Sequence, residues 1–152
     1  MIAKKSILDA VNRALVSLGR GWTVYRDGLP EQFDRPSYYI SLGKRSSKPA
    51  TRWAREIEQP VSILCIGALN EDGNADTDAL AQASDDVAEL FAIGFVRVGD
   101  RALHVDSDVT SRTADDGMEV TITLHYLDEA PGEAETEPPI TEVQTTIRAK
   151  EE

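Results

Sequence analysis

Two histidines and several carboxylates give the sequence its first candidate for chemistry. His104 and His125 fall in "RALHVDSDVTSRT" (101–113) and "MEVTITLHYLD" (118–128), where apolar and polar residues alternate. The intervening "ADDG" is typical of a hairpin turn, so the two stretches should pair antiparallel and bring His125 near Asp106. The polar face of the pair would carry His104, Asp106, Asp108, Glu119, Thr121 and His125. Such residues could bind a metal ion. They also suit the solvent side of any hairpin, and this interpretation is favoured, so no metal is predicted.

The stretch "DGNADTD" offers a second arrangement of metal-binding residue types. Oxygen-bearing side chains stand at alternate positions from Asp72 to Asp78, as in a calcium loop. An EF-hand requires glycine at its sixth position and glutamate at its twelfth, and these places hold Thr77 and Ala83. We therefore interpret the stretch as a solvated loop that caps a helix.

Nucleophilic and phosphate-binding motifs are missing from the sequence. The single cysteine, Cys65, lies in the apolar run "VSILCIG", where no neighbouring group would lower its pKa. It is predicted to be a buried, inert thiol, and one cysteine excludes an intramolecular disulfide. The ten glycines form no phosphate-binding loop, and no serine lies in a nucleophile-elbow motif. This pattern favours a structural or binding role.

The charge of the chain is strongly acidic and unevenly distributed. The formal net charge is −11, and residues 128–152 hold eight acidic residues against Arg148 and Lys150. An acidic total argues against generic nucleic-acid binding. Residues 43–55, "GKRSSKPATRWAR", are the exception, because they hold five basic residues and no acidic one. This basic segment is either a solvated loop or a surface for an acidic partner.

Neither a membrane span nor a secretion signal is indicated. No apolar run approaches the length of a membrane helix. The first residues, "MIAKKSILDAVNRAL", lack the features of a secretion signal, so a cytosolic origin is the default expectation.

Two amphipathic helices should position these residues. Apolar residues at helical spacing predict a helix over 6–19, capped by Ser6 and ended by the glycines that follow. A second helix should be capped by Asp76 or Thr77 and ended by Gly94.

Strands are predicted on either side of the second helix. "WTVYR" (22–26) is typical of a short strand, and another should start after Pro36. Alternation in the latter would turn Tyr38 toward the core and Tyr39 to the opposite face. "EIEQPVSILCIG" (56–67) is typical of a central strand.

The order of elements predicts one α+β domain over residues 1–127. Its mostly antiparallel sheet would be flanked by two α-helices, with a projecting β-hairpin and a C-terminal extended arm. Residues 128–138 are interpreted as an acidic, proline-containing linker, and residues 139–152 as a terminal strand with a charged end. Val143, Thr145 and Ile147 share one side of that strand, which suits addition to a sheet edge of its own subunit or a neighbour.

The stretch "VYRDGLPEQFDRPSYYISL" (24–42) resembles the tail terminator family of long-tailed bacteriophages. Members tend to carry a "V-Y-x-D…Q-x-F-x-x-P-S-F-F-I" pattern after an amphipathic helix. The matching residues here are Val24, Tyr25, Asp27, Gln32, Pro36, Ser37, Tyr38, Tyr39 and Ile40. Phe33 directly follows Gln32, which departs from the pattern. "RWAREIEQPVSILCIG", "LHV", "VTITLHY" and "PPITEVQTTIRAK" keep the family's order, so the resemblance spans nearly the whole chain.

The resemblance implies a structural virion protein, assembled in the cytoplasm of the host bacterium and located in the tail or neck. Such proteins form a ring, expected to be a hexamer, on the head-proximal end of the tail tube. The ring stops tube polymerisation and offers a surface to neck or head-completion proteins. The expected partners are other copies of the chain, the tail tube protein and those neck proteins, with DNA passing through the lumen. No cofactor and no reaction are expected.

Two groups of residues are predicted to make these contacts. A surface facing the tube, the lumen or a neighbour would use Lys44, Arg45, Lys48, Arg52, Trp53 and Arg55. Contacts between subunits would use Tyr39, Val143, Thr145 and Ile147. Another neck or head–tail connector subunit is the alternative within virion proteins. A small metal-dependent enzyme using the His104/His125 face is the alternative from another class.

Overall fold

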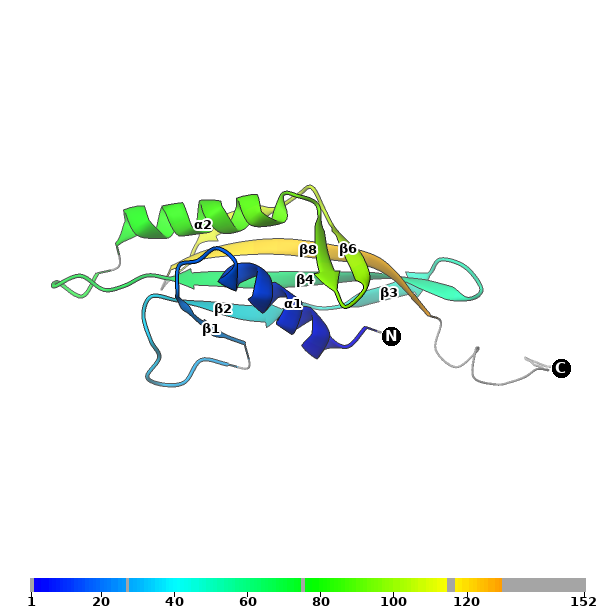
Figure 1. Cartoon of the computed structure of the whole chain (residues 1–152), viewed down its shortest axis with the longest axis horizontal. Helices are drawn as coiled ribbons and strands as arrows, with labels where there is room; N and C mark the ends of the chain where they lie inside the picture. Colours follow the sequence, from blue (N-terminus) through cyan, green and yellow to red (C-terminus); the bar gives the residue numbers. More distant parts are fainter. Residues whose placement is uncertain (1, 27, 75, 115–116, 130–152) are drawn as a thin grey trace. The chain divides into compact units, whose positions relative to one another are not determined.

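The computed structural model describes residues 2–26, 28–74, 76–114 and 117–129 (Figure 1). They form two helices and eight strands: α1 Lys4–Val16, β1 Thr23–Tyr25, β2 Ser37–Leu42, β3 Ser46–Pro49, β4 Ala54–Ile66, α2 Thr77–Phe91, β5 Phe95–Val98, β6 Arg101–Val105, β7 Thr110–Thr113 and β8 Gly117–Glu129. The main unit comprises residues 2–46 and 58–126, and a smaller unit contains residues 47–57 and the described residues from 127 onward. The predicted linker and terminal strand, 130–152, lie outside the described residues.

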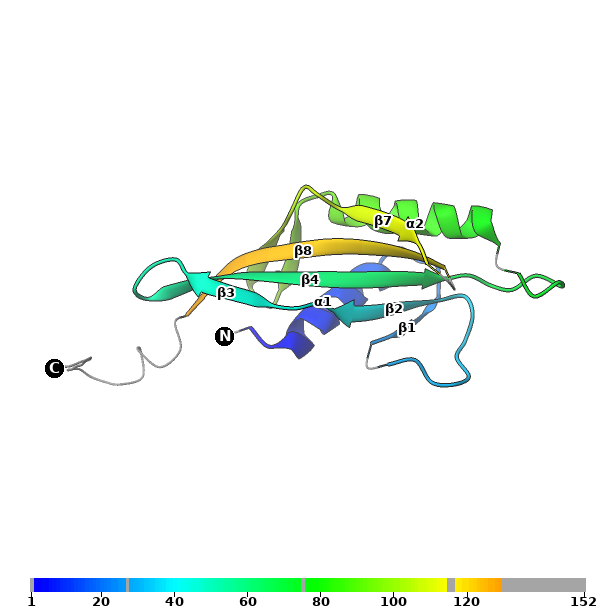
Figure 2. The ribbon, with the colours of Figure 1, turned by 180° about the vertical axis from the view of Figure 1, so that it is seen from behind.

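The sheet has the order β1-β2-β4-β8-β6-β5, with β3 paired to β4 and β7 paired to β8. β1 and β2 are parallel. The pairs β2–β4, β5–β6, β6–β8 and β7–β8 are antiparallel. Figures 1 and 2 show β4 and β8 as long neighbouring strands, with α1 and α2 on one side of the sheet in the main unit. The predicted α+β class with a mostly antiparallel sheet is confirmed.

The two helices differ in how they begin. α1 starts at Lys4, and its N-cap Ala3 offers no side-chain hydrogen bond, so the prediction that Ser6 caps this helix was wrong. Ser6 already lies inside the first turn, where its N–H donates to the Ala3 carbonyl. Asp76 caps α2 as predicted, because its side chain accepts a hydrogen bond from the N–H of Ala79 at 3.2 Å. Neither described helix has the length and apolar composition needed to cross a membrane.

The core forms where the apolar stripes of the helices meet the sheet. Its fully buried side chains include Ile7, Val11 and Leu15 of α1, Val87 and Phe91 of α2, and Ile40, Ile63, Ile122 and Leu124 of the sheet. Tyr38 is also buried, as predicted, and its ring centroid lies 5.0 Å from that of Trp22. Burial of this apolar surface is the main force that holds the helices on the sheet.

Some strands lie where the sequence predicted none. The basic segment 43–55 was expected to be a loop, but it contains β3 and the first residues of β4. All four residues of β3 are exposed, so it lacks the alternation of buried and exposed positions that reveals a strand. The predicted strand 101–113 is divided into β6 and β7 by residues 106–109.

Candidate functional site

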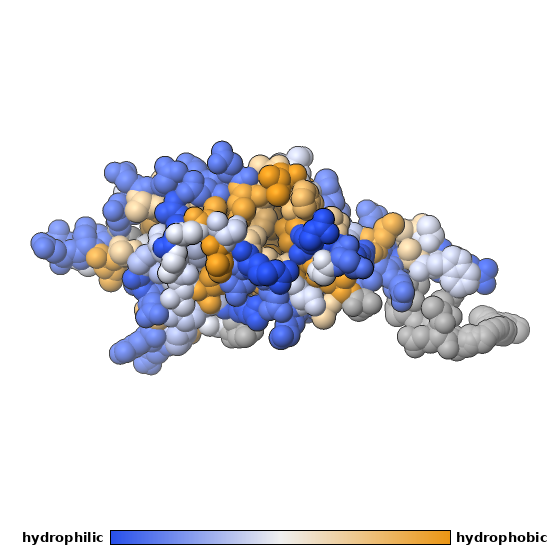
Figure 3. All heavy atoms as spheres, in the orientation of Figure 1, coloured by the Kyte–Doolittle hydropathy of each residue, from blue (hydrophilic) through white to orange (hydrophobic). Residues whose placement is uncertain are grey.

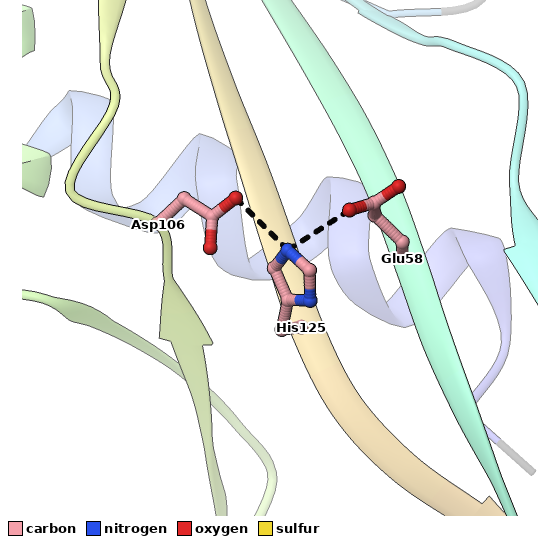
Figure 4. A group of neighbouring side chains, drawn as sticks. All are labelled: Glu58, Asp106 and His125. Atoms are coloured by element: carbon pink, nitrogen blue, oxygen red, sulfur yellow. Dashed lines mark hydrogen bonds and ion pairs between the residues drawn. The ribbon is translucent and has the colours of Figure 1, made fainter. Parts of the chain in front are cut away.

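The clearest cluster of polar side chains in the main unit consists of Glu58, Asp106 and His125 (Figure 4). Glu58 lies on β4, His125 lies on β8, and Asp106 follows the last residue of β6. Nε2 of His125 is 2.9 Å from Oδ2 of Asp106 and 3.1 Å from Oε2 of Glu58. We refer to these three residues as the β4/β6/β8 triad.

Strand pairing explains how the triad is built. His104 lies directly opposite His125, and the N–H of Asp106 donates to the Thr123 carbonyl at 2.9 Å. Asp106 thus lies near His125, as predicted. The register of β6 with β8 nevertheless differs by two residues from that of β7 with β8, where Thr110 lies opposite Thr121, since residues 106–109 interrupt the predicted hairpin strand. His104 is exposed, and its ring centroid is 6.4 Å from that of His125, so it lies next to the triad but outside it.

The remaining polar residues of the predicted hairpin face lie elsewhere. Glu119 accepts hydrogen bonds from the Ser62 hydroxyl and from Nε of Arg112, the latter at 2.7 Å. These donors hold the pKa of Glu119 below its usual value of 4.5, against the opposing effect of burial. Thr121 pairs with Thr110 of β7, and Asp108 is exposed. The predicted face is therefore divided into two separate clusters.

Glu58 is the member of the triad that the sequence did not predict. Alternation along β4 carries a signal, since Ile57 and Gln59 are buried on one face while Glu58 is exposed on the other. The missing information was the pairing of β4 with β8, which joins strands far apart in the chain and cannot be read from a local turn.

Some side chains of the predicted basic surface form hydrogen bonds or ion pairs with other residues of the chain. Nε of Arg45 donates to Oε1 of Gln59 at 3.1 Å. Gln59 is fully buried and donates in turn to the carbonyls of Gly43 and Pro60. Arg45 therefore helps to satisfy a buried amide.

Within the smaller unit, two more basic side chains have partners across β3 and β4. Arg55 donates to the hydroxyl and the carbonyl of Ser47, at 2.6 and 3.1 Å, and Lys48 lies 3.7 Å from Glu56. Trp53 is 60% exposed, and the guanidinium of Arg52 lies 4.9 Å from its ring centroid. Lys44, in the main unit, is exposed. Lys44, Arg52 and Trp53 thus retain exposed surface for a partner.

The predicted subunit contacts are only partly described. Tyr39 is half-buried on β2, in register between Tyr25 of β1 and Leu64 of β4. Val143, Thr145 and Ile147 lie outside the described residues. Cys65 is fully buried, and burial raises the pKa of its thiol to about 12, as expected of an inert cysteine.

An apolar groove lies between the helices and β5 in the main unit. It has a volume of about 260 Å³ and includes Ala10 and Ala14 of α1, Leu90 of α2, and the exposed side chains of Ile93 and Phe95. Arg13 and Arg97 also line it. Figure 3 shows hydrophobic residues gathered around a hollow where α2 ends and β5 begins. We call this feature the β5 groove.

Comparison with known proteins identifies the family of the chain. A family model described as phage tail terminator protein matches residues 6–136. The chain belongs to the phage tail terminator protein family. No curated protein matches the sequence significantly.

Membership in this family makes the tail terminator a structural component of the phage virion tail, with the tail tube as a partner. Proteins of this family are not enzymes, so the alternative of a small metal-dependent enzyme on the His104/His125 face was wrong. The β4/β6/β8 triad therefore requires an explanation other than catalysis.

Proposed function

We propose that this tail terminator closes the head-proximal end of the tail tube as a ring, expected to be a hexamer. The ring would end tube polymerisation and present its far face to neck or head-completion proteins. The family match over residues 6–136 is the observation that carries the proposal. Such a protein must bind the last tube ring more tightly than another tube subunit does, and its far face must reject further tube subunits.

The β5 groove supports the proposed contact between copies of the chain. Among the described strands β5 ends the sheet order, so one of its edges can accept another strand. Ile93 and Phe95 are 65% and 43% exposed beside it, and arginines line the groove. Residues 128–142 carry an excess of acidic residues, and Val143 and Ile147 follow them. We propose that residues 139–148 of a neighbouring copy occupy the groove, with acidic side chains near Arg13 and Arg97.

The exposed part of the basic segment is proposed to face the acidic surface of a partner or the lumen of the ring. Arg52 of the smaller unit and, separately, Lys44 of the main unit would each supply charge, and Trp53 would supply an apolar anchor with a large contact area. Arg45 is excluded from this contact surface because it already satisfies Gln59.

Electron microscopy of phage particles that lack the protein tests the capping function. Loss of a terminator should give abnormally long tails, because nothing stops tube growth. Tails of normal length that are not attached to heads would instead assign the protein to head–tail connection and contradict capping.

A variant of the basic segment tests the proposed contact surface separately. Replacement of Lys44, Arg52 and Trp53 by Ser should weaken capping and broaden the distribution of tail lengths. The matched control is Lys4→Ser with Lys5→Ser, which removes exposed positive charge from α1. Normal tail lengths with the first variant would rule out the role of this surface.

A further inference from the structure

We propose that the β4/β6/β8 triad is a binding site for a divalent transition-metal ion of the Zn²⁺ class, which links three neighbouring strands. The proposal goes beyond tail capping and does not depend on it. It rests on the arrangement of three donor atoms, on the charge around them and on the strands that carry them.

The first argument is that two carboxylate oxygens converge on one nitrogen. Nε2 of His125 lies 2.9 Å from Oδ2 of Asp106 and 3.1 Å from Oε2 of Glu58. Nε2 carries at most one proton, which cannot point along both directions. Protonation of the ring does not help, because its second N–H is on Nδ1. A single N–H therefore leaves one of the two contacts poorly aligned.

A metal ion at the centre would satisfy all three donors at once. Zn²⁺ binds histidine nitrogens and carboxylate oxygens at about 2.0–2.2 Å. Tetrahedral ligands around such an ion are about 3.4 Å apart, so both carboxylate oxygens would move a few tenths of an ångström away from Nε2 of His125. The three donor atoms lie within 4.8 Å of one another, so small side-chain rotations would bring them around one ion.

The second argument is an excess of negative charge. In the described part of the chain, Glu58 and Asp106 form ion pairs with His125 and with no lysine or arginine. Two carboxylates thus share one imidazole, and the triad is negative even when His125 is protonated. Glu119, on the same strand, differs because Arg112 neutralises it. A divalent cation would balance the triad.

The donor set also selects the kind of ion. One imidazole and two carboxylates suit Zn²⁺ and related transition metals, whereas Mg²⁺ prefers oxygen ligands and retains water. The side chains of His125, Asp106 and Glu58 are 25%, 35% and 50% exposed, so an ion can enter and keep water in its remaining positions.

The position of the triad predicts a structural effect. β4, β8 and β6 are consecutive in the sheet order, and one ligand comes from each strand or its end. An ion bound only by the folded protein stabilises that state by mass action. Zn²⁺ should therefore raise the thermal unfolding temperature, and Mg²⁺ should have little effect.

Calorimetric titration of untagged, chelator-treated full-length protein with ZnCl₂ and MgCl₂ tests the proposal. The wild type should bind one equivalent of Zn²⁺ with high affinity, and any further Zn²⁺ more weakly. Its affinity for Mg²⁺ should be much lower. His125→Gln should weaken that binding by more than about 100-fold, since loss of a supporting residue alone costs 10–100-fold. Glu58→Gln and Asp106→Asn should also weaken it. Circular dichroism identifies the variants that remain folded, and only those are compared.

Two control variants locate the ion. Glu119→Gln removes a carboxylate from the same strand outside the triad, and His104→Gln removes the neighbouring imidazole. Both should bind Zn²⁺ as the wild type does. The proposal is overturned if folded wild type binds no Zn²⁺, if Mg²⁺ binds equally well, or if the folded His125→Gln variant retains the affinity. Loss of Zn²⁺ binding in His104→Gln would place the ion between the two histidines and overturn its assignment to the triad. None of these outcomes bears on tail capping.

Discussion

At the scale of single residues, Tyr38 of β2 shows that a core position can carry a hydroxyl that makes no hydrogen bond with the described residues. Tyr38 is 1% exposed, and its hydroxyl has no hydrogen-bond partner among the described residues. Burial raises the pKa of this hydroxyl to about 12. The aromatic ring, packed against Trp22, accounts for the stabilising contribution of the residue.

Tyr38→Phe should therefore leave stability unchanged or raise the free energy of unfolding by about 1 kcal/mol. The variant keeps the ring and removes a hydroxyl that is desolvated without compensation. Urea unfolding at neutral pH measures the difference. A loss of about 1 kcal/mol or more would reveal a hydrogen bond to the hydroxyl and contradict this account.

At Gly117 a neighbouring strand's backbone leaves no room for a side chain. A Cβ at this position would lie 1.9 Å from the carbonyl oxygen of Cys65, a backbone atom of β4 that cannot rotate away. Gly117→Ala should therefore lower the free energy of unfolding by about 3 kcal/mol, the upper part of the range for overpacking. Chemical denaturation checks this value, with exposed Thr113→Ala on β7 as the control. Similar stability in both variants would mean that β8 shifts at little cost.

At the scale of elements, sequence patterns predicted those with a buried side and missed those without one. α2 and β8 repeat apolar residues with helical or strand periods, and both were predicted. β3 has only exposed residues, so its pattern resembles that of a loop. The start of α1 was misplaced because a serine suggested a cap that the backbone does not use.

The residues of the candidate site also fall into those that the sequence predicted and one that it missed. Asp106 and His125 were predicted to lie near each other from the short turn of a hairpin. They do, although this turn sets the register of β7 with β8, and β6 pairs with β8 two residues away from it. Glu58 was missed because its strand pairs with β8 through the global sheet order. Local sequence predicts local pairing, and the third member of the triad depends on the tertiary fold.

The contact between β4, β7 and β8 through Glu119 predicts a dependence of stability on pH. Hydrogen bonds from Ser62 and Arg112 lower the pKa of Glu119 below 4.5. A group whose pKa is lower in the folded state stabilises the protein above its unfolded pKa, and this contribution is lost as pH falls through the folded value.

Glu119→Gln should accordingly cost about 1 kcal/mol at pH 7, reduced by partial solvent screening. The difference from wild type should shrink as pH falls below about 4.5. Urea unfolding of both proteins across that range measures the effect. A difference that stays constant with pH would show that packing, rather than charge, accounts for the cost.

At the scale of the whole molecule, charge and apolar surface are distributed as the proposed ring would require. The chain has a net charge of −11, so copies repel one another at long range unless positive surface meets negative surface. In the β5 groove, arginines line a site with exposed apolar residues. The acidic residues from 128 onward, followed by Val143 and Ile147, have the complementary composition. Specific pairing of these two surfaces would overcome the general repulsion.

Disruption of either surface should therefore dissociate the proposed ring. Phe95→Asp places a charge in the groove, and Ile147→Asp places one on the segment proposed to fill it. Each full-length variant should have the mass of a monomer in light scattering, under conditions where wild type forms rings. Desolvation of the new carboxylate within an apolar contact provides the physical reason.

A matched variant separates this effect from a general effect of added charge. Leu69→Asp also replaces an exposed apolar residue, which is 49% exposed and lies outside the groove. It should keep the mass that the wild type has in light scattering. High salt should weaken the wild-type ring, because it screens the arginines of the groove from the acidic segment. Ring mass that Phe95→Asp leaves unchanged would exclude the β5 groove as the subunit contact, and the ring would then have to form through another surface.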